Sequence, residues 1–122
     1  PASFAATTAW PCLIGEIRDQ GQCGSCWAFG ASEALSDRCA IARGYNFIDF
    51  SPDFLVSCDS THNGCDGGNL DLVWAFMNNT GIVSDESFPY ADVTSTSGTE
   101  LPCHTSCDDG SALNYYKSYN VY

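Results

Sequence analysis

Basic residues are scarce in this sequence. Its 122 residues include 4 Lys and Arg against 15 Asp and Glu, for a formal net charge of −11 at pH 7. Nucleic acids and anionic membrane surfaces carry charge of the same sign, so we expect neither as a partner. Long apolar runs are also lacking: no stretch approaches the ~18 consecutive apolar residues of a membrane-spanning helix. The first residues, PASF, lack the basic and apolar segments of a signal peptide, so a secreted protein would carry this sequence in processed form.

Charged residues make up only 16% of the chain, whereas hydrophobic residues make up 44%. A chain of this composition can bury enough apolar surface to fold, which argues against intrinsic disorder. The length fits one small domain or a piece of a larger one.

Cysteine is in clear excess. The eight cysteines lie at positions 12, 23, 26, 39, 58, 65, 103 and 107. Such a density favours a disulfide framework formed in an oxidising compartment. A structural zinc site is the alternative, but it needs closely paired ligands. Cys23 and Cys26 form one such pair, no second C-x-x-C follows, and His62 and His104 are not spaced as a pair. We therefore expect disulfides and neither a metal nor a cofactor.

The pattern of apolar residues, caps and breakers predicts mainly helices in the first two thirds of the chain. A long helix is expected over 27–43, and a short one begins at Ser51 and Pro52, a favourable cap and first residue. Asn69 is a candidate cap for a third helix that ends at Gly81. Residues 82–122 are expected to form loops with short strands, with 94–99 as the most flexible stretch.

Cys26 lies where a loop enters the first of these helices. The first amides of a helix are unpaired donors, and the helix dipole adds partial positive charge there. A thiolate at this position is stabilised and becomes nucleophilic near neutral pH. Cys23 is close enough in sequence to compete as a partner, and a Cys23–Cys26 disulfide would instead make this a redox motif.

Residues 20–29, QGQCGSCWAF, resemble the active-site signature of the papain-like cysteine proteases. Two further segments are similar to family motifs: CDGG at 65–68 and FPY at 88–90. Within the family the chain resembles the cathepsin B-like branch, in WPC at 10–12, EIRDQG at 16–21, and FGASEA with SDR at 29–34 and 36–38. The resemblance covers nearly the whole chain.

The resemblance implies a role for each matching position. Cys26 matches the nucleophile, and Gln20 matches the side-chain donor of the oxyanion hole. The positions that match substrate-binding residues are Gly24, Ser25 and Trp27 beside the S1 and S1′ region, Gly67 and Gly68 in the strip that pairs with an extended peptide, and Asn69 and Leu70 in one wall of the S2 pocket.

Three disulfides are implied in the same way. They are Cys12–Cys39, Cys23–Cys65 and Cys58–Cys103, and Cys107 is left over. The Cys23–Cys65 bridge would tie the nucleophile loop to the glycine-rich loop and leave Cys26 free.

The implied fold is α+β and papain-like. Residues 1–122 would form the mainly helical left domain, with a long central helix and disulfide-tied loops, and the last residues would lead toward a β-rich right domain that this chain lacks. The family's catalytic His and Asn follow the nucleophile by roughly 130–150 residues, whereas this chain ends at Tyr122. We therefore expect them on a missing segment or a second chain, and the isolated chain to be inactive. His62 and His104 are interpreted as surface loop histidines.

Cathepsin B-like enzymes carry an occluding loop with two adjacent histidines. Here only residues 91–102 separate FPY from Cys103, and no adjacent histidine pair occurs. The resemblance therefore implies a thiol-dependent endopeptidase that acts through an acyl-enzyme, without the exopeptidase step. The alternatives are a catalytically inactive homologue or binding module, and a thiol–disulfide oxidoreductase that uses Cys23 and Cys26.

The expected partners are peptide or protein substrates, the segment or chain with the catalytic His and Asn, and a propeptide or protein inhibitor. The expected location is a lysosomal or endosomal vacuole, or outside the cell. Asn78 begins an N-glycosylation sequon, Asn78-Asn79-Thr80.

Overall fold

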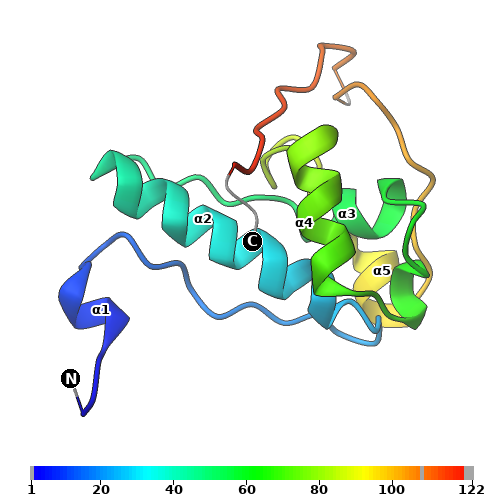
Figure 1. The fold of residues 1–122 in the computed structure, drawn as a ribbon. Coiled ribbons are helices and arrows are strands. Elements are labelled where there is room, and N and C mark those ends of the chain that lie inside the picture. The colour runs from blue at the N-terminus through cyan, green and yellow to red at the C-terminus, as the bar shows by residue number, and fades with distance from the viewer. Residues whose placement is uncertain (1, 108, 120–122) are drawn as a thin grey trace.

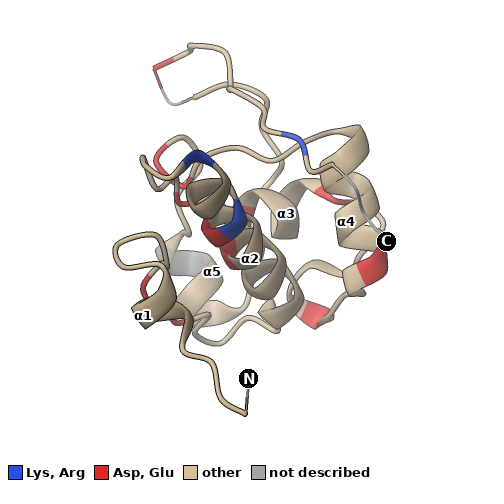
Figure 2. Ribbon diagram, turned by 60° about the vertical axis from the view of Figure 1, so that its left-hand side comes forward, with Lys and Arg blue, Asp and Glu red and all other residues tan. Residues whose placement is uncertain are grey.

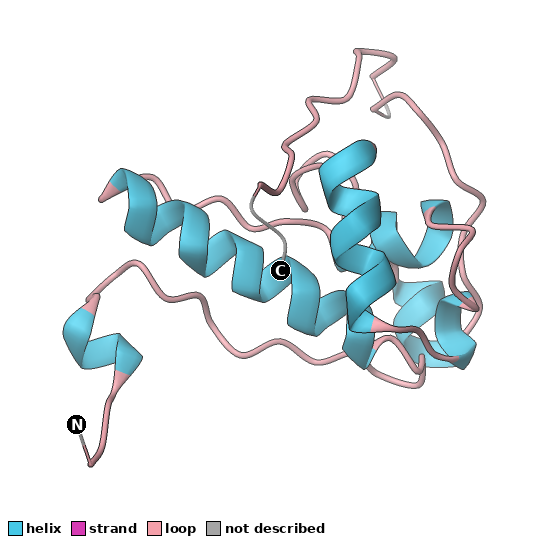
Figure 3. Ribbon diagram, in the orientation of Figure 1, coloured by secondary structure: helices cyan, strands magenta, loops and turns pink. Residues whose placement is uncertain are grey.

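The structure, a computed structural model, describes residues 2–107 and 109–119, and helices dominate it (Figures 1 and 3). In chain order the elements are α1 (Ala6–Ala9), α2 (Cys26–Arg43), α3 (Pro52–Cys58), the 3₁₀ turn η1 (Gly64–Asp66), α4 (Leu70–Asn79) and α5 (Asp92–Ser97). None of the helices in this described part is long and apolar enough to cross a membrane. Acidic residues are distributed over several helices and loops rather than gathered on one face (Figure 2).

Helix α2 is the long central element, and both α3 and α4 pack against it. It ends where Gly44 takes a left-handed conformation at φ 72°, a backbone geometry that glycine adopts without strain. Its inward face is built from Trp27, Ala28, Ala31 and Leu35, all of them buried. The bounds agree with the predicted helix over 27–43 to within one residue.

The two shorter helices begin at the predicted caps. Ser51 Oγ accepts the backbone N–H of Phe54, and Pro52 is the first residue of α3. Asn69 accepts the N–H of Asp71 at the start of α4. With α2, these helices enclose a core whose largest fully buried side chains include Phe50, Leu55, Val73, Met77, Ile82, Val83 and Phe88.

The short strands predicted in 82–122 are absent from the described residues, which form isolated bridges instead. Ile82 and Tyr116 exchange two backbone hydrogen bonds of 2.7 Å each. Ser106 and Ala112 form a second bridge, while Ser84 pairs with Phe50.

Helix α5 occupies part of the stretch that was predicted to be the most flexible. Asp53 of α3 explains the difference, because its carboxylate accepts the N–H of Ala91 at 2.8 Å and the hydroxyl of Thr94 at 3.3 Å. Asp53 and Thr94 are both fully buried. The N-terminal cap of α5 therefore comes from a side chain 38 residues earlier in sequence, which local patterns cannot reveal.

The extended segment before α2 is held by charged side chains. Arg18 forms an ion pair with Asp85 at 2.8 Å and a longer one with Asp49 at 3.5 Å. The N–H of Gly15 donates to Asp37 of α2 at 2.8 Å. The lead-in thus follows the surface of α2 without entering the core (Figure 1).

The predicted Cys12–Cys39 bridge is not formed, since both cysteines are free in this structure. Cys12 is exposed in a left-handed conformation at φ 64°, just after α1. Helix α1 buries none of its residues, and its backbone hydrogen bonds are local, such as that from the Trp10 N–H to the Ala6 carbonyl. Little therefore holds Cys12 against α2.

Burial raises the pKa of Asp53 above its ordinary value of 3.8, despite the hydrogen bonds that it accepts. A pKa raised by folding contributes stability that is complete at low pH and lost as the pH rises through the folded-state value. In the whole protein we therefore expect the stability of wild type relative to Asp53→Asn to fall with rising pH, by at most about 1.4 kcal/mol per pH unit. Urea unfolding of both proteins from acid to neutral pH measures this difference. A relative stability that rises with pH would contradict the assignment.

Candidate active site

Cys26 is the first residue of α2, with an exposed and unbridged thiol. The helix begins tightly at this point: Ala28 and Phe29 both donate to the carbonyl of Ser25, at 2.9 and 3.0 Å. No side chain caps the N-terminus at Ser25. The thiol therefore lies beside the unpaired amides and positive dipole end of an 18-residue helix, as the sequence predicted.

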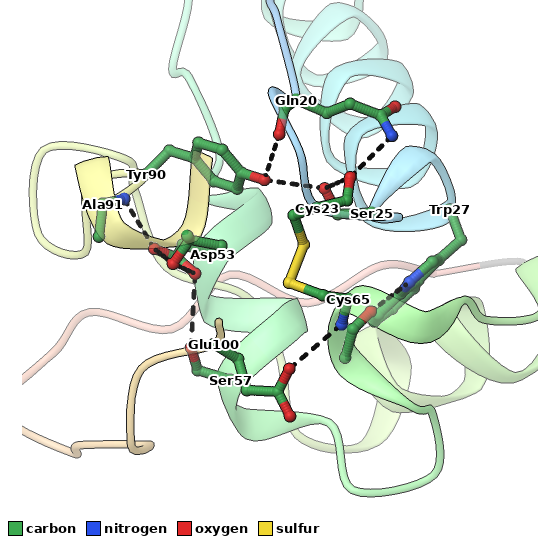
Figure 4. Close-up of a disulfide and its surroundings, with 12 residues drawn as sticks. Gln20, Cys23, Ser25, Trp27, Asp53, Ser57, Cys65, Tyr90, Ala91 and Glu100 are labelled. Atoms are coloured by element: carbon green, nitrogen blue, oxygen red, sulfur yellow. Dashed lines mark hydrogen bonds between the residues drawn. A yellow bond between two sulfur atoms is a disulfide. The ribbon is translucent and has the colours of Figure 1, made fainter. Parts of the chain in front are cut away.

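The Cys23–Cys65 disulfide joins the loop before Cys26 to the glycine-rich loop (Figure 4). Gly24 strengthens this junction, since its N–H donates to the carbonyl of Cys65 at 2.8 Å and a Cβ there would overlap that oxygen. The bridge confirms the predicted pairing and leaves Cys26 without a disulfide partner at Cys23. The predicted Cys58–Cys103 bridge is also confirmed.

Gln20 is held from both its side chain and its backbone (Figure 4). Its amide Nε2 donates to the carbonyl of Cys23 at 2.8 Å, and its own carbonyl accepts the hydroxyl of Tyr90 at 2.8 Å. The buried hydroxyl of Ser25 lies 2.9 Å from the same Tyr90 oxygen. Because the Tyr90 proton goes to Gln20, Ser25 donates to Tyr90.

Tyr90 therefore links Gln20 and Ser25, the residues that flank Cys23 in the loop before α2. Burial raises the pKa of Tyr90 above its ordinary value of 10, which keeps its hydroxyl protonated as a donor. The sequence analysis noted this tyrosine within the FPY motif but gave it no role. A half-buried tyrosine near a loop is a signal for such a bond, although the partner cannot be read from spacing.

The second side of the site is the glycine-rich loop after α3. Gly67 has φ 112°, and its carbonyl accepts the N–H of Asn63 at 3.1 Å. Gly68 lies against the rings of Trp27 and His62 so closely that a Cβ there would overlap both. The indole N–H of Trp27 donates to the carbonyl of Gly64 at 3.1 Å.

A surface hollow of about 420 Å³ lies along this loop, and His62, Asp66, Gly67, Gly68, Asn69 and Leu72 are among the residues that line it. The structure thus brings Gly67, Gly68 and Asn69 to one concave surface, with the buried Trp27 beneath them. Leu70 is 53% exposed at the start of α4, and it does not line the hollow. Asn78 lies in the last turn of α4 and is half-buried.

His62 does not fit the surface-loop interpretation, because its side chain is only 1% exposed. Its ring is stacked on Trp27 with a centroid distance of 4.2 Å and an interplanar angle of 8°. Its Nδ1 lies 2.9 Å from Asp59 Oδ2. His104 is likewise stacked, on Phe88 at 4.1 Å. Sequence reasoning missed both contacts because stacking partners lie far away in sequence.

Within residues 2–107 and 109–119, no group of three or more His, Cys, Asp and Glu side chains is arranged to hold a metal ion.

The family model for papain family cysteine proteases matches residues 1–122. A curated relative, "Cathepsin B-like CP3" of Giardia intestinalis, is 41% identical over 120 residues, which cover 97% of this chain and 40% of that protein. A mouse protein, "Tubulointerstitial nephritis antigen-like", is 43% identical over 93 residues, covering 75% of this chain and 20% of that protein.

Among solved structures, "proCathepsin B S9 from Trypanosoma congolense" superposes with a TM-score of 0.83 at 29% identity, covering 96% of this chain and 41% of that one. The papain-like fold predicted from sequence is thereby confirmed, in the form of its mainly helical left domain. The chain spans well under half the length of each of these three proteins.

The Tyr90 bonds generate a stability prediction. In Tyr90→Phe, the Gln20 carbonyl and the buried Ser25 hydroxyl lose their shared partner, which we expect to lower the free energy of unfolding by about 1–3 kcal/mol. Urea unfolding of the whole protein measures the change. Tyr45→Phe is the matched control, because Tyr45 is 64% exposed and should shift stability by less than about 0.5 kcal/mol. Equal effects of the two substitutions would refute the network.

Proposed function

Because this chain belongs to the papain family of cysteine proteases, we propose that it supplies the nucleophile and half of the substrate cleft of a thiol-dependent endopeptidase. One observation carries the proposal: Cys26 is free and exposed at the start of α2, while the neighbouring Cys23 is bound to Cys65. The thiol thus lies beside the unpaired amides and the positive dipole end of a helix, where a negatively charged nucleophile is favoured.

In the proposed reaction the Cys26 thiolate attacks the carbonyl carbon of the scissile peptide bond and forms a C–S bond. The C–N bond then breaks, and the amine leaves with a proton supplied by a histidine. Water next attacks the acyl-enzyme, which releases the carboxylic acid and restores the thiol. The histidine and the asparagine that orients it are proposed to come from a segment or second chain outside these 122 residues, so we expect the isolated chain to be inactive.

The oxyanion of the tetrahedral intermediate needs preorganised donors. The amide group of Gln20 carries two N–H bonds, and only one is directed to the Cys23 carbonyl. The second N–H, together with the backbone N–H of Cys26, is the proposed oxyanion hole. The Tyr90 and Cys23 bonds to Gln20 support this role because they restrict its movement before substrate arrives.

The hollow beside Gly67 and Gly68 is the proposed binding surface for an extended peptide. Glycines let a peptide backbone approach closely and pair with the strip through main-chain hydrogen bonds. Asn69 and the exposed Leu70 are proposed as one wall of the S2 pocket. Gly24, Ser25 and Trp27 are proposed to shape the region next to the nucleophile.

The segment between Tyr90 and Cys103 supports the endopeptidase assignment. Its first part forms α5 over Asp92–Ser97, and residues 98–102 then lead directly to Cys103. No insertion with adjacent histidines is present to bind a substrate C-terminus. The cleft would therefore remain open for a polypeptide that extends past the scissile bond.

The proposed partners are peptide and protein substrates, and a propeptide or protein inhibitor that covers the cleft. The two disulfides support a location in an oxidising compartment, either a lysosomal or endosomal vacuole or the outside of the cell. No cofactor takes part in the proposed reaction.

An inactive homologue that acts as a binding module is the second candidate. The similarity to the mouse protein, whose name mentions no protease, favours it. The free Cys26 and the restrained Gln20 favour the protease, because binding alone requires neither group. The oxidoreductase alternative lacks support, since the Cys23–Cys65 bridge removes its second thiol.

Two substitutions in the whole protein test the proposed catalytic roles. We expect Cys26→Ala to abolish peptide hydrolysis, and Gln20→Ala to lower kcat by about 10²–10³-fold because one oxyanion donor is lost. The readout is steady-state hydrolysis of a blocked fluorogenic peptide. Gln22→Ala is the matched control, since exposed Gln22 uses its backbone N–H, not its side chain, to bond Ser95. An unchanged kcat in Gln20→Ala would refute the oxyanion role.

The open cleft predicts a preference among substrates. We expect efficient cleavage within peptides that are blocked at both ends, and little release of C-terminal dipeptides from peptides with a free carboxylate. Mass spectrometry of products from one peptide, with and without a C-terminal amide, measures the preference. Faster cleavage of the free acid with dipeptide release would contradict the endopeptidase assignment.

A further inference from the structure

We propose that His62, held as a doubly protonated imidazolium by Asp59, positions the Gly67–Asn69 backbone for peptide binding, so that substrate binds more tightly at acidic pH. The inference rests on the proposed function, because it concerns the glycine strip that is proposed to bind substrate. It assigns a positioning residue, since His62 acts through the backbone of the strip.

The His62 ring is confined on one face and at both nitrogens. The stacked indole of Trp27 covers the face at 4.2 Å. Nδ1 lies 2.9 Å from Asp59 Oδ2, and Nε2 lies 2.9 Å from the carbonyl oxygen of Asn69. The side chains of His62 and Asp59 are 1% and 0% exposed. The ring is therefore held on three sides, by buried Asp59, by buried Trp27 and by Asn69 at the edge of the hollow.

The partners of the ring require two protons on it. A backbone carbonyl only accepts hydrogen bonds, so Nε2 donates to Asn69. Asp59 Oδ1 already accepts the N–H of Thr61 at 3.0 Å and its hydroxyl at 2.6 Å. Asp59 Oδ2 is buried and accepts no hydrogen bond from the described residues, so the group that compensates it is Nδ1 of His62, which lies 2.9 Å away as an ion-pair contact.

Thr61 cannot supply the missing proton. Its hydroxyl oxygen also lies 3.1 Å from Nδ1, but its single proton is directed to Asp59 Oδ1. Nδ1 thus faces two oxygen atoms and no donor. The arrangement is a buried imidazolium–carboxylate pair, in which each charge is compensated by the other.

The ring sets the position of the strip. Its Nε2 bond holds the carbonyl of Asn69, the residue that caps α4, while Asn63 holds the carbonyl of Gly67. Gly68 lies between these two bonds, directly against the His62 and Trp27 rings, with no space for a Cβ. A displacement of His62 would therefore move the backbone on which the extended peptide is proposed to lie.

The charged groups around His62 bear on the expectation that substrate binding weakens as the pH rises. Among the described residues, Asp59, which follows α3, is the charged group in contact with the ring. Asp66 of η1 lines the same hollow, whereas Trp27, Gly68 and Asn69 carry no charge. Both acidic groups are opposite in sign to a protonated ring.

Histidine changes its charge between about pH 5 and 8. A neutral ring has one proton for two acceptors, so the bond to Asn69 or the bond to Asp59 is lost. The strip is then held less firmly.

The experiment compares wild type, His62→Phe, Asp59→Asn and His104→Gln in the whole protein, by measuring KM and kcat for a long blocked peptide from about pH 5 to 8. His62→Phe keeps an aromatic ring against Trp27 but removes both donors. In Asp59→Asn the introduced amide can donate to Nδ1, so a neutral ring satisfies every partner at any pH. His104→Gln is the matched control, because His104 is also stacked on an aromatic ring but donates to Ser106, outside the strip.

We expect the wild-type KM to rise with pH, and the KM of His62→Phe to exceed the wild-type value at pH 5 by about tenfold, with kcat changed much less. The KM ratio of His62→Phe to wild type should decrease as the pH rises. The KM ratio of Asp59→Asn to wild type should fall below one over the same rise in pH. His104→Gln should follow wild type. Dividing each variant's KM by the wild-type KM at the same pH removes the pH dependence of the catalytic groups, because all four proteins share those groups.

Equal KM values and equal pH profiles for His62→Phe and wild type would overturn the inference while leaving the proposed function intact. His62→Phe leaves the Asp59 charge uncompensated and could fail to fold for that reason. In that case the double variant His62→Phe with Asp59→Asn, which lacks the charge, is compared with wild type instead of the single variant.

Amide hydrogen exchange over residues 63–69 tests the same role without catalysis. We expect His62→Phe or the double variant to lose about tenfold in protection there at acidic pH, and His104→Gln to lose none. Unchanged protection would overturn the inference even if the protein hydrolyses no peptide. Absence of hydrolysis with the predicted loss of protection would instead refute the proposed function alone.

Discussion

The covalent joint between the two loops of the site is the constraint on which the other features depend. The Cys23–Cys65 bridge places the segment before Cys26 against the glycine-rich loop, and the Gly24–Cys65 backbone bond makes the contact close. Because Cys23 is consumed in the bridge, the thiol of Cys26 stays free at the start of α2. One bond therefore brings the proposed nucleophile to the proposed peptide-binding strip and preserves its reactivity.

Each loop is then supported from behind by polar contacts with distant parts of the chain. Tyr90 reaches Gln20 and Ser25, and α5 receives the N–H of Gln22 at the carbonyl of Ser95. Asp53 caps α5, and α5 in turn bonds Gln22, so Asp53 supports the loop around Gln20 indirectly. On the other side, the Trp27–His62 stack supports Gly68. The described residues form helices, loops and isolated bridges, so side-chain hydrogen bonds fix the two loops of the site where a sheet would use backbone ladders.

The sequence predicted the parts of the site whose signals are local. The bounds of α2, the Ser51 and Asn69 caps and the helical position of Cys26 follow from residues within one or two turns of each other. The Cys23–Cys65 and Cys58–Cys103 pairs were implied by family resemblance, and the structure contains both. The Cys12–Cys39 pair, implied in the same way, is absent because the segment around Cys12 makes little contact with α2.

What the sequence by itself determined is the family, the helical frame and the position of the proposed nucleophile at a helix start, since each depends on residue types at short spacings. What only the tertiary structure decided is which distant side chains support that frame. Asp53 turns residues predicted to be flexible into α5, and the contacts with Trp27 and Asp59 turn a histidine interpreted as a surface residue into a stacked ring with a buried side chain. The physical reason is that burial and hydrogen-bond partners are properties of the packed chain, so spacing along the sequence does not contain them.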